Sequence, residues 1–211
     1  MKSGTFFRYH GADTPEDNAM ATLSGKKVLM VIAPEQFRDE ELAEPKAVLE
    51  KAGAAVTLAS SRKGTAQGML GATATPTLLL QDARPRDYDA IVVVGGMGSP
   101  EHLWPDSNLH RLLTTVRDQG GVVGGICLSG AALARAGVLK GLEATVYSTP
   151  ESLDEMKKGG AKYVKKDVVT TGKVITAEGP HAARKFGEAL VAALAASGAP
   201  APAPAPAPAK K

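Results

Sequence analysis

The sequence is poor in the residues that build disulfide frameworks and metal centres. It has one cysteine, Cys127, among 211 residues, so an internal disulfide is excluded. Its four histidines are scattered without paired spacing. Because structural zinc sites need several closely spaced Cys or His ligands, we expect no metal and no cofactor in the functional site.

Long apolar runs and a concentration of charge of one sign are also missing. No apolar run is long enough to cross a bilayer, and residues 1–10 carry charge without a following apolar segment, which makes a poor secretory signal. We therefore expect a protein of the reducing cytoplasm with no membrane partner. The formal net charge is +3, and the basic residues are scattered rather than gathered in a stripe, so we expect no nucleic-acid partner.

The composition predicts one folded domain with two extensions. With 44% hydrophobic and 22% charged residues, the chain can bury one good core. Residues 1–24 are polar and rich in turn formers, and we assign them to an N-terminal extension. Residues 25–197 form the predicted domain. Residues 198–211 repeat Ala-Pro pairs that cannot pack a core, so we expect a flexible, extended tail.

Apolar runs alternate with helical patterns along the predicted domain. The expected strands are residues 26–33, 55–60, 90–94, 121–126 and 143–148, with a hairpin at 164–170 and 173–177. The expected helices are residues 39–52, 106–119, 131–136, 150–158 and 180–196. Continuous apolar strands are typical of a parallel sheet covered on both faces. The pattern predicts an α/β fold, a three-layer α/β/α sandwich with a flavodoxin-like, doubly wound, mostly parallel sheet.

Cys127 lies where a predicted strand turns sharply into a helix. Gly125 and Ser129, two residues before and after it, are small enough to let the chain turn without clashes, which is typical of a nucleophile elbow. The helix that follows directs unpaired N–H groups at the sulfur, which predicts a lowered thiol pKa and a reactive thiolate. The alternative is a cysteine that serves as a small core hydrophobe. The glycine spacing favours the nucleophile.

Three predicted loops meet at the carboxyl ends of the strands, where ligands bind in this type of sheet. They carry Glu41, Gly96 and Cys127. The N–H groups of Gly96 and Leu128 are suited to an oxyanion hole, and a partly buried Glu41 with a raised pKa could carry a proton. The alternative for Glu41 is a solvated or capping acid at a helix start. Pro45 cannot bond to the Glu41 carbonyl, so we expect irregular backbone at Glu41.

Four separated motifs in order carry a family resemblance: residues 37–45 (FRDEELAEP), 93–96 (VVGG), 125–127 (GIC) and 178–180 (EGP). With them the chain resembles the ThiJ/PfpI superfamily of class I amidotransferase-like cysteine proteins, over residues 26–196. The resemblance implies that Glu41 hydrogen-bonds the cysteine, that Cys127 is the nucleophile and that Gly96 belongs to the oxyanion hole. It also implies a homodimer or a higher homo-oligomer.

The chain departs from the superfamily at its histidines. Protease-like members have a histidine directly after the nucleophile, where this chain has Leu128, and deglycase-like members have one where this chain has Thr149. A late His-x-Glu pair, needed by amidotransferases, is also missing. His181 is the candidate replacement, with an exposed helix-start residue as the alternative, and His102 could border the pocket or belong to a surface loop. Residues that could line the pocket are Met97, Ser129, Thr149, Pro180 and His181.

The favoured function is that of a cysteine-dependent stress-defence enzyme acting on a small carbonyl substrate. By resemblance it is a glutathione-independent glyoxalase III or deglycase acting on methylglyoxal or glycated groups, with Cys127 attacking the carbonyl and Glu41 moving protons. One alternative is an oxidation-sensing chaperone that uses the same cysteine. Another is an intracellular cysteine peptidase, which Leu128 disfavours.

Overall fold

The computed structural model describes residues 22–197. Most of the predicted N-terminal extension and the whole Ala-Pro tail lie outside these residues. Leu23 is buried, and its N–H donates to the Ala52 carbonyl at 2.7 Å. The packed part of the chain therefore begins slightly before residue 25, where the sequence analysis placed its start.

Short helices and strands alternate along the described chain. The strands are β1 (Lys27–Val31), β2 (Glu35–Phe37), β3 (Ala55–Ser60), β4 (Ala66–Gly68), β5 (Thr73–Ala74), β6 (Leu78–Leu79), β7 (Ala90–Val93), β8 (Val122–Ile126), β9 (Glu143–Ala144), β10 (Lys162–Tyr163), β11 (Val168–Thr171) and β12 (Val174–Ala177). The α-helices are α1 (Asp39–Lys51), α2 (Ser99–His102), α3 (Ser107–Asp118), α4 (Gly130–Arg135), α5 (Pro150–Lys158) and α6 (Ala183–Ala196). The 3-10 turns are η1 (Leu80–Asp82), η2 (Pro85–Asp87), η3 (Cys127–Ser129) and η4 (Pro180–Ala182).

The main sheet has seven strands in the order β11-β12-β8-β7-β1-β3-β6. All neighbours pair in parallel except β11 with β12. Counted in chain order, the five central strands β3, β1, β7, β8 and β12 lie in the order 2-1-3-4-5 of flavodoxin-like sheets. The predicted doubly wound α/β fold is confirmed. Its topological switch point lies at β1 and β7, where the loops after β1 and β7 lead away in different directions.

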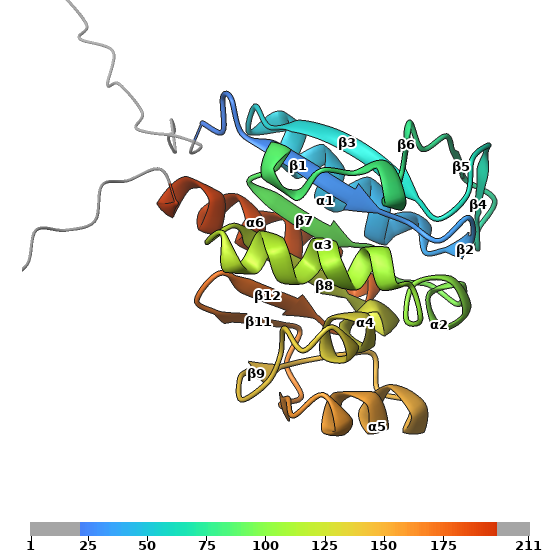
Figure 1. Ribbon diagram of the computed structural model, residues 1–211, viewed down its shortest axis with the longest axis vertical. Coiled ribbons are helices and arrows are strands. Elements are labelled where there is room, and N and C mark those ends of the chain that lie inside the picture. Colours follow the sequence, from blue (N-terminus) through green and yellow to red (C-terminus); the bar gives the residue numbers. More distant parts are fainter. Residues whose placement is uncertain (1–21, 198–211) are drawn as a thin grey trace, which may run out of the picture.

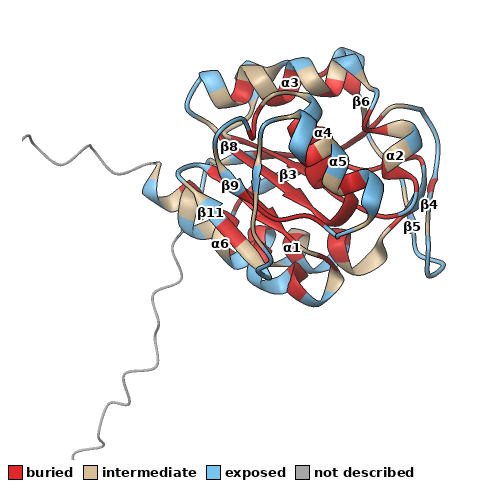
Figure 2. Cartoon of the chain, turned by 90° about the horizontal axis from the view of Figure 1, so that it is seen from below, coloured by how far each residue is buried: buried red, intermediate tan, exposed pale blue. Residues whose placement is uncertain are grey.

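Helices cover both faces of this sheet. In Figure 1, α3 crosses in front of the strands while α1 and α6 lie behind them, and α1 packs against α6. Figure 2 shows the buried strands between these layers. Two glycines of β8 let helices approach the strand from opposite faces: a Cβ atom at Gly124 would lie 2.9 Å from Leu190 Cδ2, and one at Gly125 would lie 2.8 Å from Leu133 Cδ1. The strand β8, which leads into Cys127, is therefore packed closely between α6 and α4.

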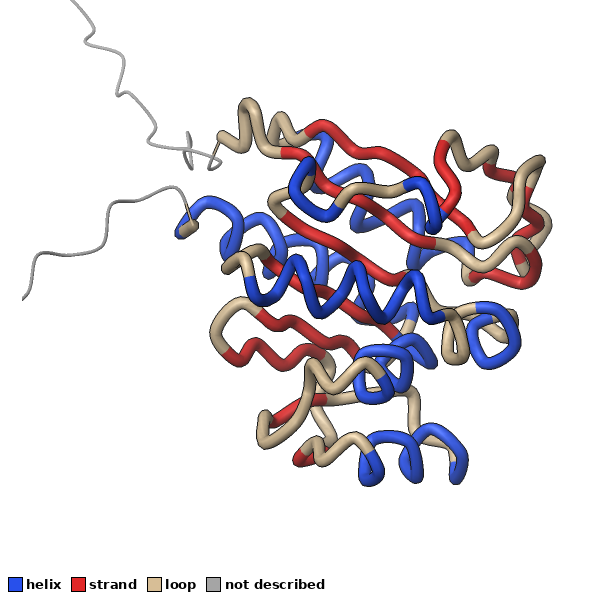
Figure 3. Tube along the Cα trace, in the orientation of Figure 1, coloured by secondary structure: helices blue, strands red, loops and turns tan. Residues whose placement is uncertain are grey.

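Two local predictions differ from the structure. The strand expected over residues 143–148 is only β9, two residues long, because the chain then turns toward the elbow and Tyr147 N–H donates to the Cys127 carbonyl at 3.4 Å. The irregular backbone expected at Glu41 is wrong, since α1 is continuous through Pro45 and Glu41 lies in its first turn. The region from residue 61 to 83 consists of loops, the short strands β4, β5 and β6, and the turn η1 (Figure 3). Among residues 22–197, no helix is long and apolar enough to span a membrane.

Candidate active site

Cys127 lies at a strained corner of the backbone. β8 ends at Ile126 in extended conformation, and Cys127 has a φ of +57°, a left-handed value that non-glycine residues seldom adopt. The chain then enters η3 and α4. This is the strand, turn and helix geometry expected of a nucleophile elbow, and it leaves the Cys127 side chain, 7% exposed, on the wall of a pocket.

Buried hydrogen bonds hold the elbow in place. Ser129 Oγ donates to the Val94 carbonyl at 2.7 Å and lies 2.8 Å from Ser99 Oγ. Trp104 Nε1 donates to the Leu128 carbonyl at 2.8 Å. These contacts tie the residues after Cys127 to the end of β7 and to the segment that follows it. The strained backbone at the cysteine is therefore supported from two neighbouring elements.

Glu41 reaches the same point from the first turn of α1. Its carboxyl is fully buried, and Oε2 accepts the Gly95 N–H at 3.1 Å. A Cβ atom at Gly95 would lie 2.5 Å from Glu41 Oε2 and 2.6 Å from Cys127 Cβ. A side chain at this position would therefore collide with both residues, and the glycine lets them lie close together. The other carboxyl oxygen, Oε1, is buried without a hydrogen-bond partner among the described residues.

Gly96 brings a backbone N–H to the sulfur. Its φ of +109° is open to glycine, and a Cβ atom there would collide with the Gln36 carbonyl and with the backbone N of Arg38. The N–H groups of Gly96 and Leu128 both hydrogen-bond the Cys127 sulfur and lower its pKa. These are the two donors that the sequence analysis assigned to the oxyanion hole, and they lie at the reacting atom.

Burial and mutual charge set the protonation of Glu41 and Cys127. Burial raises the pKa of the Glu41 carboxyl to about 7. Burial, and then the negative charge of Glu41, raise the pKa of the Cys127 thiol to about 12. This direction is opposite to the lowered thiol pKa expected from the sequence, because loss of water around the sulfur outweighs the neighbouring N–H groups. Since the two groups interact, they titrate as a pair that holds one proton between these values.

The single proton of the pair can be bound to the Cys127 sulfur or to the Glu41 carboxyl. With the proton on sulfur, the carboxylate is stabilised by the Gly95 N–H; with the proton on oxygen, the thiolate is stabilised by the N–H groups of Gly96 and Leu128. Arg38 also favours ionisation of the pair, since its charge lowers the pKa of Glu41. The arrangement supplies a nucleophile and a proton carrier side by side.

The pocket in front of the sulfur has a volume of about 310 Å³. It is lined by Arg38, Glu41, Met69, Gly96, Met97, Cys127, Leu128, Tyr147 and Pro180. The structure thus brings together all four residues proposed for the chemistry, and two of the five proposed for the pocket wall.

Ser129, Thr149 and His181 do not line this pocket. Ser129 is buried beneath the elbow, as described above. Thr149 caps α5, where its hydroxyl accepts the Ser152 N–H at 3.1 Å. The exposed His181 side chain turns to the surface, with Nε2 3.4 Å from Asp167 Oδ1. His102, the other histidine considered, is also not among the lining residues.

Three wall residues were not predicted. Arg38 stood in the FRDEELAEP motif beside Glu41, which was a usable signal. The sequence around Met69 and Tyr147 contains no signal for a pocket residue. Met69 lies in a loop, and Tyr147 lies in a segment that was expected to be a strand. Met69 reaches the site because its N–H donates to the Phe37 carbonyl at 2.9 Å, a contact between residues far apart in sequence.

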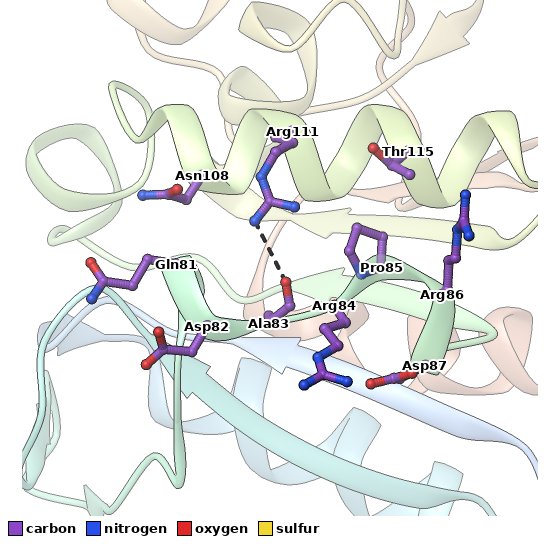
Figure 4. Close-up of a pocket in the computed structure, with 10 residues that line it drawn as sticks. All are labelled: Gln81, Asp82, Ala83, Arg84, Pro85, Arg86, Asp87, Asn108, Arg111 and Thr115. Atoms are coloured by element: carbon purple, nitrogen blue, oxygen red, sulfur yellow. Dashed lines mark hydrogen bonds between the residues drawn. The ribbon is translucent and has the colours of Figure 1, made fainter.

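Two other features of the surface lie apart from the cysteine. A larger, open hollow of about 770 Å³ lies between α3 and the turns η1 and η2, and Figure 4 shows Arg111 of α3 donating to the Ala83 carbonyl there. It contains no nucleophile. On another face, Asp167, Glu178 and His181 place carboxylate and imidazole atoms close together. Lys185 pairs with Asp167 at 2.9 Å, so these side chains form a surface ion-pair network.

Comparison with known proteins agrees with this geometry. The model of the DJ-1/PfpI family matches residues 26–193. An uncharacterized protein of Methanocaldococcus jannaschii is 49% identical over 174 residues, which cover 82% of this chain and 85% of the relative. A deglycase of Pyrococcus horikoshii is 32% identical (73% and 90% covered), and a glutathione-independent glyoxalase of Caenorhabditis elegans is 30% identical (80% and 89% covered).

A solved structure gives the same fold. The ThiJ/PfpI domain protein from Brachyspira murdochii superposes with a TM-score of 0.77 at 32% identity, covering 82% of this chain and 99% of that chain. A cysteine at a nucleophile elbow on a flavodoxin-like sheet, with a buried glutamate beside it, defines a class of cysteine-centred α/β proteins. Within that class, the chain belongs to the DJ-1/PfpI family.

Proposed function

We propose that this protein is a cysteine-dependent, glutathione-independent glyoxalase or deglycase that acts on the carbonyl of an α-oxoaldehyde or of an early glycated amine. The observation that carries the proposal is the meeting of Cys127 and Glu41 at one pocket, with two N–H donors at the sulfur and with burial raising the pKa of Glu41 to about 7. Relatives named as a deglycase and as a glutathione-independent glyoxalase support the reaction class.

The first step adds the thiol to the aldehyde. A sulfur to carbon bond forms, the carbonyl bond to oxygen becomes single, and the proton that leaves the sulfur passes through Glu41 to the new hydroxyl. The N–H groups of Gly96 and Leu128 stabilise the oxygen while it carries negative charge. A carboxyl whose pKa is about 7 can both accept and return this proton at neutral pH.

The second step moves a proton between carbons. Glu41 removes the proton of the former aldehyde carbon while the ketone oxygen takes up a proton, which gives an enediol. Glu41 then delivers the proton to the neighbouring carbon, and the hydroxyl on the sulfur-bearing carbon loses its proton and becomes a carbonyl, which leaves a thioester of a 2-hydroxy acid on Cys127. Water then attacks the thioester, the carbon to sulfur bond breaks, and the thiol regains its proton. Methylglyoxal and water thus give lactate with no external oxidant or reductant. For an early glycated amine, the bond between carbon and nitrogen breaks as sulfur bonds to that carbon, and the amine leaves with the thiol proton; the later steps are the same.

The test is lactate formation from methylglyoxal by the purified full chain without glutathione. We expect Cys127→Ser to lower kcat/KM by about a thousandfold or more, since it removes the nucleophile. We expect Glu41→Gln to lower it by about a hundredfold or more, the usual contribution of a proton carrier. Glu44→Gln is the matched control, because Glu44 is an exposed glutamate of the same helix. Equal rates in the wild type and Cys127→Ser would rule out the proposed function.

A further inference from the structure

We infer that the natural substrate class is α-oxoaldehydes with an uncharged, apolar substituent larger than methyl, held by Met69, Met97 and Tyr147. The inference rests on the proposed function and names the substrate for the same site.

The size of the pocket is the first observation. Its volume is about 310 Å³. A water molecule occupies about 30 Å³ in the liquid, so methylglyoxal, comparable to about four waters, fills roughly a third of the space. The remaining space is large enough for a longer substituent on the ketone carbon.

The apolar rim is the second observation. The described chain exposes four large hydrophobic side chains: Met69 (38%), Leu70 (62%), Met97 (58%) and Tyr147 (49%). Three of the four line this one pocket, and Leu70 is the neighbour of the first. They come from three separate segments, namely the loop after β4, the turn after β7 and the loop after β9. Large apolar side chains gathered from separate segments at a pocket mouth mark a binding surface.

The charge of the wall is the third observation. Arg38 is the one cationic side chain among the lining residues. Its guanidinium is held by Glu40 through two hydrogen bonds, Nε to Oε2 at 2.8 Å and Nη2 to Oε1 at 3.0 Å. This fork pairs one edge of the guanidinium with a carboxylate and offsets its charge, so Arg38 attracts a carboxylate or phosphate on the substrate less than an unpaired arginine would. The substituent that fits is therefore neutral.

Backbone contacts hold these walls in place before a substrate arrives. Tyr147 N–H donates to the Cys127 carbonyl at 3.4 Å, and the Tyr147 carbonyl accepts the Ser152 hydroxyl at 2.6 Å. On the other side, the Met69 N–H donates to the Phe37 carbonyl at 2.9 Å. A preformed wall converts buried apolar area into affinity with little ordering cost.

The test measures kcat/KM for methylglyoxal, butylglyoxal, phenylglyoxal and 4-carboxyphenylglyoxal, by quantifying the 2-hydroxy acid formed. Each buried methylene favours binding about fourfold, so we expect butylglyoxal to exceed methylglyoxal by about tenfold or more. The alkyl pair compares substrates of similar intrinsic reactivity. We expect 4-carboxyphenylglyoxal, which adds a charge to the same ring, to fall about tenfold or more below phenylglyoxal.

Substitutions at two of the exposed apolar residues of the pocket test whether these side chains cause the preference for butylglyoxal over methylglyoxal. Met97→Ser and Tyr147→Ser should each lower the ratio of butylglyoxal to methylglyoxal about fivefold to tenfold. Leu70→Ser, which removes an equally exposed apolar side chain that does not line the pocket, should leave the ratio unchanged. A wild-type ratio near one, or a ratio that Met97→Ser and Tyr147→Ser do not alter, would overturn the substrate class while Cys127-dependent lactate formation still supports the proposed function. If no substrate in the series gives Cys127-dependent product, both proposals fail.

Discussion

The proposed chemistry depends on two buried side chains, and burial makes each of them harder to ionise. Glu41 is fully buried, and Cys127 is nearly so. Burial removes most of the solvent that would stabilise a charge on either group, so backbone N–H groups stabilise the charge that remains after the first proton leaves. Gly95, Gly96 and Leu128 supply these groups. In the proposed mechanism, moving a proton from Cys127 to Glu41 over a short distance activates the nucleophile at the moment of attack.

Burial of Glu41 predicts a pH-dependent cost to stability. The folded chain keeps the Glu41 proton to about pH 7, whereas the unfolded chain loses it near the ordinary value of 4.5. Between these values the unfolded state binds fewer protons, so this group lowers stability as pH rises. Glu41→Gln cannot ionise, and its free energy of unfolding relative to the wild type should rise by about 3 kcal/mol from pH 4.5 to pH 8.

Urea unfolding of the wild type and of Glu41→Gln at pH 5, 6, 7 and 8 measures this difference. The increase should level off above about pH 7, where the folded carboxyl is also ionised. Glu44→Gln controls for removing a carboxylate from the same helix. A difference between Glu41→Gln and the wild type that is constant across this pH range would show that the buried carboxyl does not have a raised pKa.

At the scale of elements, glycines decide how closely the helices pack. Gly187 of α6 faces α1, where a Cβ atom would lie 2.9 Å from Pro45 Cα and 3.1 Å from Val48 Cβ. Because α1 carries Glu41 in its first turn, the close contact of α1 with α6 also fixes the helix that positions the carboxyl.

Gly187→Val should therefore destabilise the fold. Overfilling a packed contact costs about 1–3 kcal/mol, and the backbone of α1 cannot move away as a flexible side chain could. Ala192→Val, at an exposed position of the same helix, should cost only about 0.5 kcal/mol through its lower helix propensity. Chemical denaturation of both variants checks this. Equal losses would mean that the contact between α1 and α6 is looser than described.

Most elements could be predicted from local pattern, and the exceptions have physical causes. Continuous apolar runs and helical spacing located β1, β3, β7 and β8 and the main helices, because burial on both faces leaves a clear signal. The expected strand at residues 143–148 is mostly loop. Ala144 and Val146 are buried there while Tyr147 is exposed, and an apolar run alone does not distinguish a strand from such a loop.

At the scale of the whole molecule, the sequence predicted that the four residues proposed for the chemistry lie together, but it predicted the rest of the pocket wall less well. Cys127, Glu41 and Gly96 all follow strands whose carboxyl ends meet at one edge, and that rule places them together without any knowledge of side-chain packing. Met69 and Tyr147 reach the pocket through long-range backbone contacts that no local pattern records. The direction in which the Cys127 pKa shifts also depends on burial by the whole fold. The sequence around the following helix indicated only the N–H groups near the sulfur, not this burial.

The central claim is that Cys127 and Glu41 share one proton, and the pH dependence of Cys127 alkylation tests it most directly. The chain has one cysteine, so the rate of mass gain with iodoacetamide reports on this sulfur alone. For the wild type we predict a rise in rate with an inflection near pH 7, where the pair loses its first proton, and loss of that inflection in Glu41→Gln. A single inflection near about 8.5, the value of free cysteine, in both proteins would contradict the account.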